Sequence, residues 1–132
     1  MRAVDTNVVV RLLARDDPKQ VAAAEAFVVS GAWVSLIVLQ ETMWVLQRAY
    51  GVDRARQQIA IEMLLEHDLL VLESPRVVRD ALETFRASRG AGFSDCLVLA
   101  VARGTGNLPL GTFDRKLARL RGAELASGRP RP

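Results

Sequence analysis

Short apolar runs alternate along the chain with longer stretches in which apolar residues recur at helical spacing. The short runs are residues 2–5, 32–35, 69–72 and 108–111, and a helical stretch follows each of them. This alternation is typical of an α/β domain with a mostly parallel sheet, because each crossover helix returns the chain to the same end of the sheet. The run at 69–72 is continuously apolar, which predicts a strand buried on both faces. Pro109 makes the last strand short and irregular.

Residues suited to helix ends mark the helical stretches. Asp17 precedes Pro18, a favourable start because Asp caps free N–H groups and Pro has no N–H to leave unpaired. Gly31 and Gly51 follow two of the stretches and end them. We therefore expect helices over about residues 6–15, 18–29, 36–50, 53–67, 94–103 and 114–121, with one more opened by Ser74-Pro75.

The length and composition fit one globular domain. The chain has 132 residues, 50% hydrophobic and 25% charged, as in a well-packed protein. We expect a single domain over residues 1–122, followed by an edge strand or frayed tail over residues 123–132. The lone Cys96 lies in an apolar run and is expected to be a buried, reduced thiol, which favours a cytoplasmic location. No apolar run approaches the ~18 residues of a membrane span.

The basic side chains are nearly all arginine. The net charge of +3 comes from 18 Lys and Arg against 15 Asp and Glu, and Lys19 and Lys116 are the only lysines. Arginine suits bidentate contacts to phosphate. A compositional habit of the source organism explains the same bias, and both interpretations remain open.

Three acids occupy equivalent places at the starts of predicted helices. Asp5 and Asp114 each follow a predicted strand, and Asp95 lies in the first turn after the glycines at 90 and 92. In an open parallel sheet, strand carboxyl ends and helix amino ends share one edge, where ligands bind. We therefore expect the three carboxylates to meet there. The alternative for each is helix capping alone, which stabilises a helix by about 0.5–2 kcal/mol.

Glu41 favours a site over capping. It lies in a predicted helix built mainly of apolar residues, which should be substantially buried, and Glu is almost never buried without a partner. Its alternative is an exposed stripe shared with Gln40, Gln47 and Arg48. If the four acids meet, pairs of charges ~4 Å apart repel by about 4 kcal/mol, and a divalent cation removes this conflict. Oxygen ligands without His or Cys select Mg²⁺ or Mn²⁺ over zinc.

Four short motifs, in order along the chain, resemble the PIN-domain family. They are Val4–Asn7, Val34–Glu41, Gly92–Leu97 and Thr112–Leu117. Each is weak alone, but four in order, in the right strand or helix context and in a chain of matching length, are specific. The resemblance spans Met1 to about Leu120. Within the family, the chain looks like the toxin ribonucleases of bacterial and archaeal VapBC toxin–antitoxin pairs.

The resemblance implies a fold and a set of site residues. The fold is a PIN-like three-layer sandwich, in which helices flank a mostly parallel central sheet of four to five strands. The implied catalytic and metal-binding residues are Asp5, Glu41, Asp95 and Asp114. The supporting polar positions, which by their chemistry should orient carboxylates, are Thr6, Asn7, Ser94 and Thr112. Leu108–Gly111 replaces the more regular strand expected there, which leaves that strand's boundary open.

The implied activity is Mg²⁺- or Mn²⁺-dependent endonucleolytic hydrolysis of RNA, leaving 5′-phosphate and 3′-hydroxyl ends. The implied partners are the RNA substrate and a cognate antitoxin protein. Arg115 and Lys116, beside Asp114, are candidate RNA contacts, with a solvated helix face as the alternative. The apolar faces of the first helices serve a homodimer, a partner's helix or the ordinary core; their residues are Val8, Leu12, Val21, Ala24, Phe27 and Val28.

Two other functions compete with this one. A PIN-like domain that binds RNA or protein without cutting should lack one or more of the acids, and all four are present. A metal-free ribonuclease typically needs two groups that titrate near neutral pH, commonly histidines, and His67 is the only histidine. The sequence therefore favours a metal-dependent ribonuclease.

Overall fold

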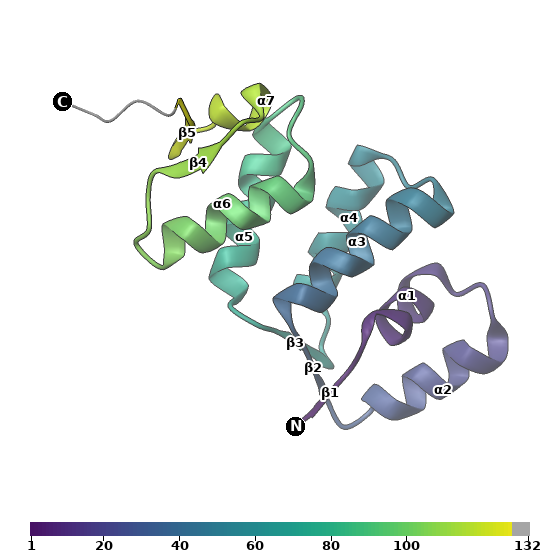
Figure 1. Cartoon of the computed structure of the whole chain (residues 1–132). Helices are drawn as coiled ribbons and strands as arrows, with labels where there is room; N and C mark the ends of the chain where they lie inside the picture. Colours follow the sequence, from purple (N-terminus) through teal and green to yellow (C-terminus); the bar gives the residue numbers. More distant parts are fainter. Residues whose placement is uncertain (128–132) are drawn as a thin grey trace. The chain divides into compact units, whose positions relative to one another are not determined.

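The computed structural model describes residues 1–127. Its backbone forms two compact units, which we call unit 1 (Met1–Arg76) and unit 2 (from Val77 onward). Residues 128–132, the end of the predicted tail, lie outside the described residues. Figure 1 shows the order of the elements along the chain.

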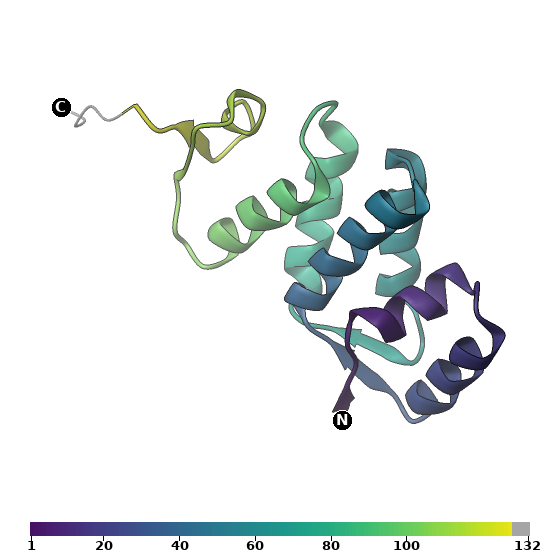
Figure 2. The ribbon, with the colours of Figure 1, turned by 45° about the vertical axis from the view of Figure 1, so that its right-hand side comes forward.

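Unit 1 contains a parallel sheet and four complete helices. Its elements are β1 (Arg2–Ala3), α1 (Thr6–Ala14), α2 (Pro18–Val28), β2 (Ala32–Val34), α3 (Leu36–Tyr50), α4 (Arg54–Glu66) and β3 (Leu70–Leu72). The strands pair in the order β1-β2-β3, all parallel, with Val34 opposite Leu72. Helices α3 and α4 lie side by side in both ribbon views (Figures 1 and 2), joined by a turn at Gly51 with φ of 61°.

Side-chain caps explain where the helices of unit 1 begin. Asp17 accepts a hydrogen bond from the N–H of Gln20, with Pro18 at the first helical position. Asp53 accepts one from the N–H of Arg56, which starts α4. Each cap satisfies an N–H that has no partner within the helix. The sequence-based helix starts at these two positions are confirmed.

Strands β2 and β3 are buried on one side only. Ala32 and Val34 in β2 are buried while Trp33 between them is exposed, and Val71 in β3 is exposed between two buried leucines. The prediction that residues 69–72 are buried on both faces is therefore wrong. Successive side chains in a strand point to opposite faces, so Ala32 and Val34 of β2 lie on its buried face.

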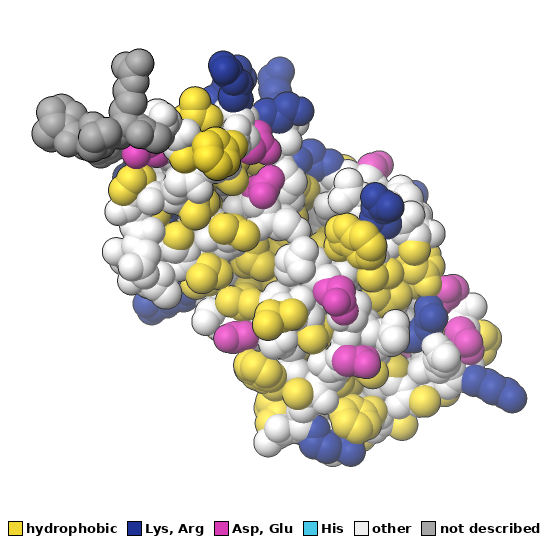
Figure 3. Space-filling model, viewed as in Figure 1, with side chains coloured by type: hydrophobic (Ala, Val, Ile, Leu, Met, Phe, Trp, Pro, Cys, Tyr) yellow, Lys and Arg dark blue, Asp and Glu magenta, His cyan; other side chains and the backbone are white. Residues whose placement is uncertain are grey.

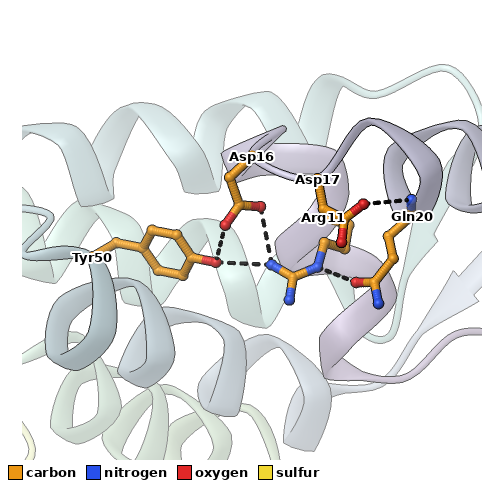
Figure 4. A network of polar contacts seen from close by, with 5 residues as sticks. All are labelled: Arg11, Asp16, Asp17, Gln20 and Tyr50. Carbon is orange, nitrogen blue, oxygen red and sulfur yellow. Dashed lines mark hydrogen bonds and ion pairs between the residues drawn. The ribbon is translucent and has the colours of Figure 1, made fainter.

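A polar network links the first three helices of unit 1 (Figure 4). Arg11 on α1 donates to Asp16 at 3.0 Å and to the hydroxyl of Tyr50 at 2.8 Å. That hydroxyl in turn donates to Asp16 at 2.8 Å, and Arg11 Nε donates to Gln20 on α2. The network ties the α1–α2 loop to the end of α3.

The apolar residues of α1 and α2 are divided between core and surface. Val21, Ala24 and Val28 are buried in the structure, as members of the core. Val8, Leu12 and Phe27 are partly exposed. Val21, Ala24 and Val28 are therefore ordinary core residues. Only the partly exposed apolar residues of these helices are available to a partner.

Unit 2 contains helices and a separate parallel pair of strands. Helix α5 (Pro75–Ala87) begins at the end of unit 1 and continues into unit 2. The elements that follow are α6 (Phe93–Gly104), β4 (Leu110–Thr112), α7 (Arg115–Ala118) and β5 (Ala123–Leu125). Strand β4 pairs with β5 in parallel, with Leu110 opposite Ala123.

The core of unit 2 forms on one face of α5 and α6. Phe85 and Phe93 are both buried and meet edge to face, with ring centroids 5.7 Å apart. Cys96 is buried and has no disulfide, as expected. Arg103 on α6 pairs with Asp80 on α5 at 2.6 Å and donates to the carbonyl oxygen of Arg121 at 2.8 Å. These contacts fix α5, α6 and the chain before β5 within one unit.

The α/β class, the helices and the parallel strands agree with the predicted fold, but the strands are divided differently. The described strands form one sheet of three and one of two, whereas one central sheet of four to five strands was expected. The reason lies in the strand pairing: β1 pairs with β2, and β4 pairs with β5. Helix α7 also ends at Ala118 rather than at residue 121, because Leu120 N–H turns back to the carbonyl of Leu117 before β5 begins. None of the helices within residues 1–127 is long and apolar enough to cross a bilayer.

Candidate functional site

Asp5 stands at the junction of β1 and α1. Its carboxylate caps α1 by accepting a hydrogen bond from the N–H of Val8 at 3.1 Å, and the residue is exposed. Asp5 and Asn7 line one end of a hollow of about 380 Å³ between α1 and α2, whose wall also includes Arg11. A carboxylate oxygen accepts more than one hydrogen bond or metal bond, so the cap leaves Asp5 able to bind a cation.

Glu41 projects from α3 toward the start of α1. The hydroxyl of Thr6, the residue after Asp5, donates a hydrogen bond to Glu41 Oε1. Asp5 and Glu41 are thus linked through Thr6, although their positions in the sequence are far apart.

The prediction that Glu41 lies in a substantially buried helix is wrong. Glu41 is exposed, and so are Ile37 and Trp44 on the same helix, with 78% and 51% of their surface in solvent. Leu39, Met43 and Leu46 form the buried face. Helix α3 packs along one side, so its high apolar content does not place every residue in the core.

Two residues fix the amino end of α3. Ser35 caps the helix by accepting from the N–H of Val38 at 3.1 Å. Glu73, directly after β3, accepts from the N–H of Leu36 at 2.8 Å. Glu73 was not singled out from the sequence, although an acid directly after an apolar run is a signal for this edge of a parallel sheet. It anchors the helix that carries Glu41 to the end of β3.

Asp95 lies in the first turn of α6, as the sequence predicts, and is partly buried. Burial raises the pKa of its carboxyl, and the negative charge of Asp114 raises that pKa further. Both effects penalise the ionised form of Asp95. Asp114 is therefore close enough for its charge to disfavour the ionisation of Asp95.

Asp114 occupies the turn between β4 and α7. Its carboxylate accepts from the N–H of Lys116 at 2.8 Å and from that of Leu117 at 3.4 Å. Its own N–H donates to the hydroxyl of Thr112 at 3.0 Å. Thr112 thus fixes the backbone of Asp114, and the carboxylate is exposed.

The structure brings the predicted acids together as two pairs. Asp5 and Glu41 belong to unit 1, and Asp95 and Asp114 belong to unit 2. Over residues 1–127, no group of three or more His, Cys, Asp or Glu side chains has the arrangement of a metal site.

The donor atoms of both pairs suit a hard divalent cation. Carboxylate and hydroxyl oxygens are the ligands that Mg²⁺ and Mn²⁺ prefer. The softer ligands are committed elsewhere: Cys96 is buried in the core, and His67 Nδ1 accepts from the N–H of Leu69 at 3.1 Å. The raised pKa of Asp95 also fits, because a bound cation offsets the repulsion from Asp114.

The remaining predicted residues surround these pairs. Asn7 is exposed beside Asp5, and Ser94 is partly buried beside Asp95. Arg115 and Lys116 are exposed on α7. Their exposure fits both interpretations of these residues, as RNA contacts and as a solvated helix face.

Comparison with known proteins identifies a family. A family model described as the PIN domain matches residues 2–123, nearly the whole chain. A search of curated proteins and a search of solved structures found no match.

Proposed function

The chain belongs to the PIN-domain family, and we propose from this membership that it is an Mg²⁺- or Mn²⁺-dependent endoribonuclease. The family indicates a nuclease-like function with a nucleic acid as substrate. The finer assignments, to RNA and to these ions, are our proposal. They are supported by the motifs around the acids and by the oxygen-only donor sets.

We propose that the metal-binding and catalytic residues are Asp5 and Glu41 in unit 1 and Asp95 and Asp114 in unit 2. The observation that carries this proposal is the position of Asp114 near Asp95, where the charge of Asp114 adds to burial in raising the pKa of Asp95. An ionised Asp95 is unfavourable there in a merely structural role, and a cation bound between the two carboxylates offsets that cost. When bound, the ion would acidify the attacking water and stabilise the charge that develops on the phosphate.

The protein's own residues orient these carboxylates. Thr6 holds one oxygen of Glu41, which restricts the rotation of that long side chain. Thr112 fixes the backbone at Asp114, and the N–H groups of α7 hold its carboxylate. Groups that orient ligands in this way typically change metal affinity or activity by about 10–100-fold when removed.

A capping role is the main alternative for Asp5. Asp53 provides a matched comparison, because it caps α4 through the N–H of Arg56 at 2.9 Å, much as Asp5 caps α1. Asn at either position retains an oxygen that accepts the capping bond but removes the charge. Capping alone predicts that Asp5→Asn and Asp53→Asn behave alike.

The decisive assay is cleavage of total RNA with Mg²⁺ or Mn²⁺, with and without EDTA. We expect wild type and Asp53→Asn to cleave, and EDTA, Asp5→Asn and Asp95→Asn each to abolish cleavage. Activity that survives both chelation and substitution would contradict the metal mechanism. RNA binding without cleavage by the metal-loaded wild type would favour the non-cutting alternative.

We further propose that the chain is the toxin of a type II toxin–antitoxin pair, with an antitoxin protein as partner and a homodimer as its assembly. The support is the resemblance of the four motifs to those of VapBC toxins. Expression of the wild-type chain should arrest growth, while Asp95→Asn should not. Light scattering of the purified chain tests the dimer independently of activity.

A further inference from the structure

Phe113 is an aromatic side chain left in solvent beside the candidate site. Its exposed fraction is 84%, the largest for any aromatic residue within the described part of the chain. Isolated exposed hydrophobic residues are common and need no special explanation. Phe113 is informative because it separates Thr112 from Asp114, the two residues whose hydrogen bond forms the turn.

The backbone on both sides of Phe113 is held in place. The carbonyl oxygen of Thr112 accepts from the N–H of Ala126 at 2.8 Å, beyond the end of β5. Asp114 is bonded to Thr112 on one side and to the N–H of Lys116 on the other. A ring attached to a fixed backbone stays close to this turn and exposes its faces to solvent, which suits base stacking.

Cationic side chains lie on the same turn. Arg115 and Lys116 follow Asp114 and are exposed. A Cβ added at Gly90 would lie 3.2 Å from Cδ of Lys116. The aliphatic part of the Lys116 side chain therefore packs against the backbone of Gly90. Gly90 belongs to the loop that leads into α6 and Asp95. Lys116 is therefore positioned between the two segments that carry the acids of unit 2.

We propose that Phe113 is a stacking platform for an unpaired RNA base, with Lys116 binding a neighbouring phosphate. The proposal rests on the ribonuclease function and specifies its substrate class as single-stranded RNA. Stacking on an aromatic ring is available to every base, but only where the base is not enclosed in a duplex. A lysine next to the platform neutralises the phosphate that enters with the base.

A protein partner fits this surface less well. A protein-docking site has an apolar centre formed by several neighbouring side chains, whereas the sequence neighbours of Phe113 are Thr112, Asp114 and Arg115. Figure 3 shows hydrophobic side chains interspersed with charged and polar ones on the viewed face. A ring followed in the sequence by an acid and two exposed cationic residues is better suited to a base and its phosphates.

Binding should be measured separately from cleavage. The probe is a single-stranded RNA oligonucleotide that contains 2-aminopurine, whose fluorescence falls when it stacks, and the protein is the full chain with Asp95→Asn. We expect binding with quenching in this background. Phe113→Leu should remove most of the quenching and weaken binding about tenfold, as for the loss of one base–aromatic stack, whereas Phe113→Tyr should retain both.

The matched control is Val98→Ala, which shortens another exposed apolar side chain of unit 2 and should leave quenching unchanged. The same sequence as a duplex should show little quenching with any variant. Equal quenching by the Asp95→Asn protein with Phe113 and by the same protein with Phe113→Leu would overturn the proposal. Unchanged RNA binding combined with a smaller assembly for Phe113→Leu would also overturn it, in favour of a protein contact. Because cleavage by the chain with Phe113 intact tests the ribonuclease separately, the two proposals fail in distinguishable ways.

Discussion

The hydroxyl of Thr6 donates a hydrogen bond to Glu41 Oε1 across 35 positions of sequence. Thr6 is buried in the first turn of α1, so its hydroxyl has a fixed position relative to Asp5, the preceding residue. Glu41 is exposed and would otherwise sample several rotamers. The bond therefore restrains the carboxylate of Glu41 at the residue that follows Asp5.

Thr6→Val should weaken metal binding without unfolding the chain. Val has nearly the shape of Thr but cannot donate, so Glu41 loses its restraint. We expect Mn²⁺ affinity, measured by isothermal titration calorimetry, to fall about tenfold, the lower end of the range for groups that orient metal ligands. Thr6→Ser keeps the hydroxyl and serves as the control. Equal Mn²⁺ affinity in the Val and Ser variants would show that the bond has only a structural role.

The stability of the metal-free protein should depend on the ionisation of Asp95. Its folded-state pKa is raised above the ordinary value of 3.8, first by burial and then by the charge of Asp114. The folded state therefore holds this proton more tightly than the unfolded state, and the free energy of unfolding falls as pH rises from 3.8 through the raised pKa.

Asp95→Asn should remove that pH dependence. In urea unfolding series without metal, we expect wild type to lose stability relative to the variant as pH rises through this window, by roughly 0.5 kcal/mol, since solvent screens a partly exposed pair. Added Mg²⁺ should reverse the difference by stabilising wild type. Parallel curves for the two proteins at all pH values would contradict the assigned cause.

The local parts of the fold were the predictable ones. Asp17, Asp53 and Gly51 mark helix ends through bonds to residues a few positions away, and the sequence shows both partners of each bond. The positions of Asp5, Asp95 and Asp114 at helix starts follow from the same local signals. Metal binding at these residues remains a prediction.

The predictions that were wrong concern features set by contacts between residues far apart in the sequence. The apolar content of α3 cannot show which side another helix covers, so Glu41 was expected to be buried but is exposed. The bond between Glu73 and the N–H of Leu36 spans 37 positions, and no local sequence pattern predicts that these two residues are partners. The predicted helix over residues 114–121 was too long because the chain turns at Leu120 to enter β5, a long-range pairing with β4.

The network around Arg11 should make unit 1 sensitive to acid. The hydroxyl of Tyr50 lowers the pKa of Asp16 most, and the charge and hydrogen bond of Arg11 also lower it (Figure 4). A depressed folded-state pKa means that the stabilisation is present above the unfolded value of 3.8 and is lost as pH falls through the folded value.

Tyr50→Phe should reduce this acid sensitivity. We expect a lower urea midpoint than wild type at neutral pH, and a smaller loss of stability below pH 3.8, because the hydroxyl that favours ionised Asp16 is gone. The effect should be small, since these side chains are near the surface. Circular dichroism at a series of pH values measures it, with Asp16→Asn as a second variant that removes the ionisable group. A Tyr50→Phe curve that merely shifts down by the same amount at every pH would rule out the link to Asp16.

Thr42 offers a route to a more stable protein. Its side chain is fully buried, with 0% exposed, and its Oγ1 has no hydrogen-bond partner within residues 1–127. A buried hydroxyl without a partner costs about 1–3 kcal/mol of desolvation free energy. Thr42→Val keeps the shape of the side chain and replaces the hydroxyl with a methyl group.

We expect Thr42→Val to increase the free energy of unfolding by about 1 kcal/mol, because the desolvation cost disappears and one more methyl group is buried. Thr42→Ser keeps the hydroxyl, loses the methyl and leaves a small gap, so it should be destabilised by about 1 kcal/mol. Urea unfolding of the two variants measures both changes. If Val were destabilising and Ser neutral, the hydroxyl would have to be hydrogen-bonded in solution, and the core beside Glu41 would need a buried water or another partner at that position.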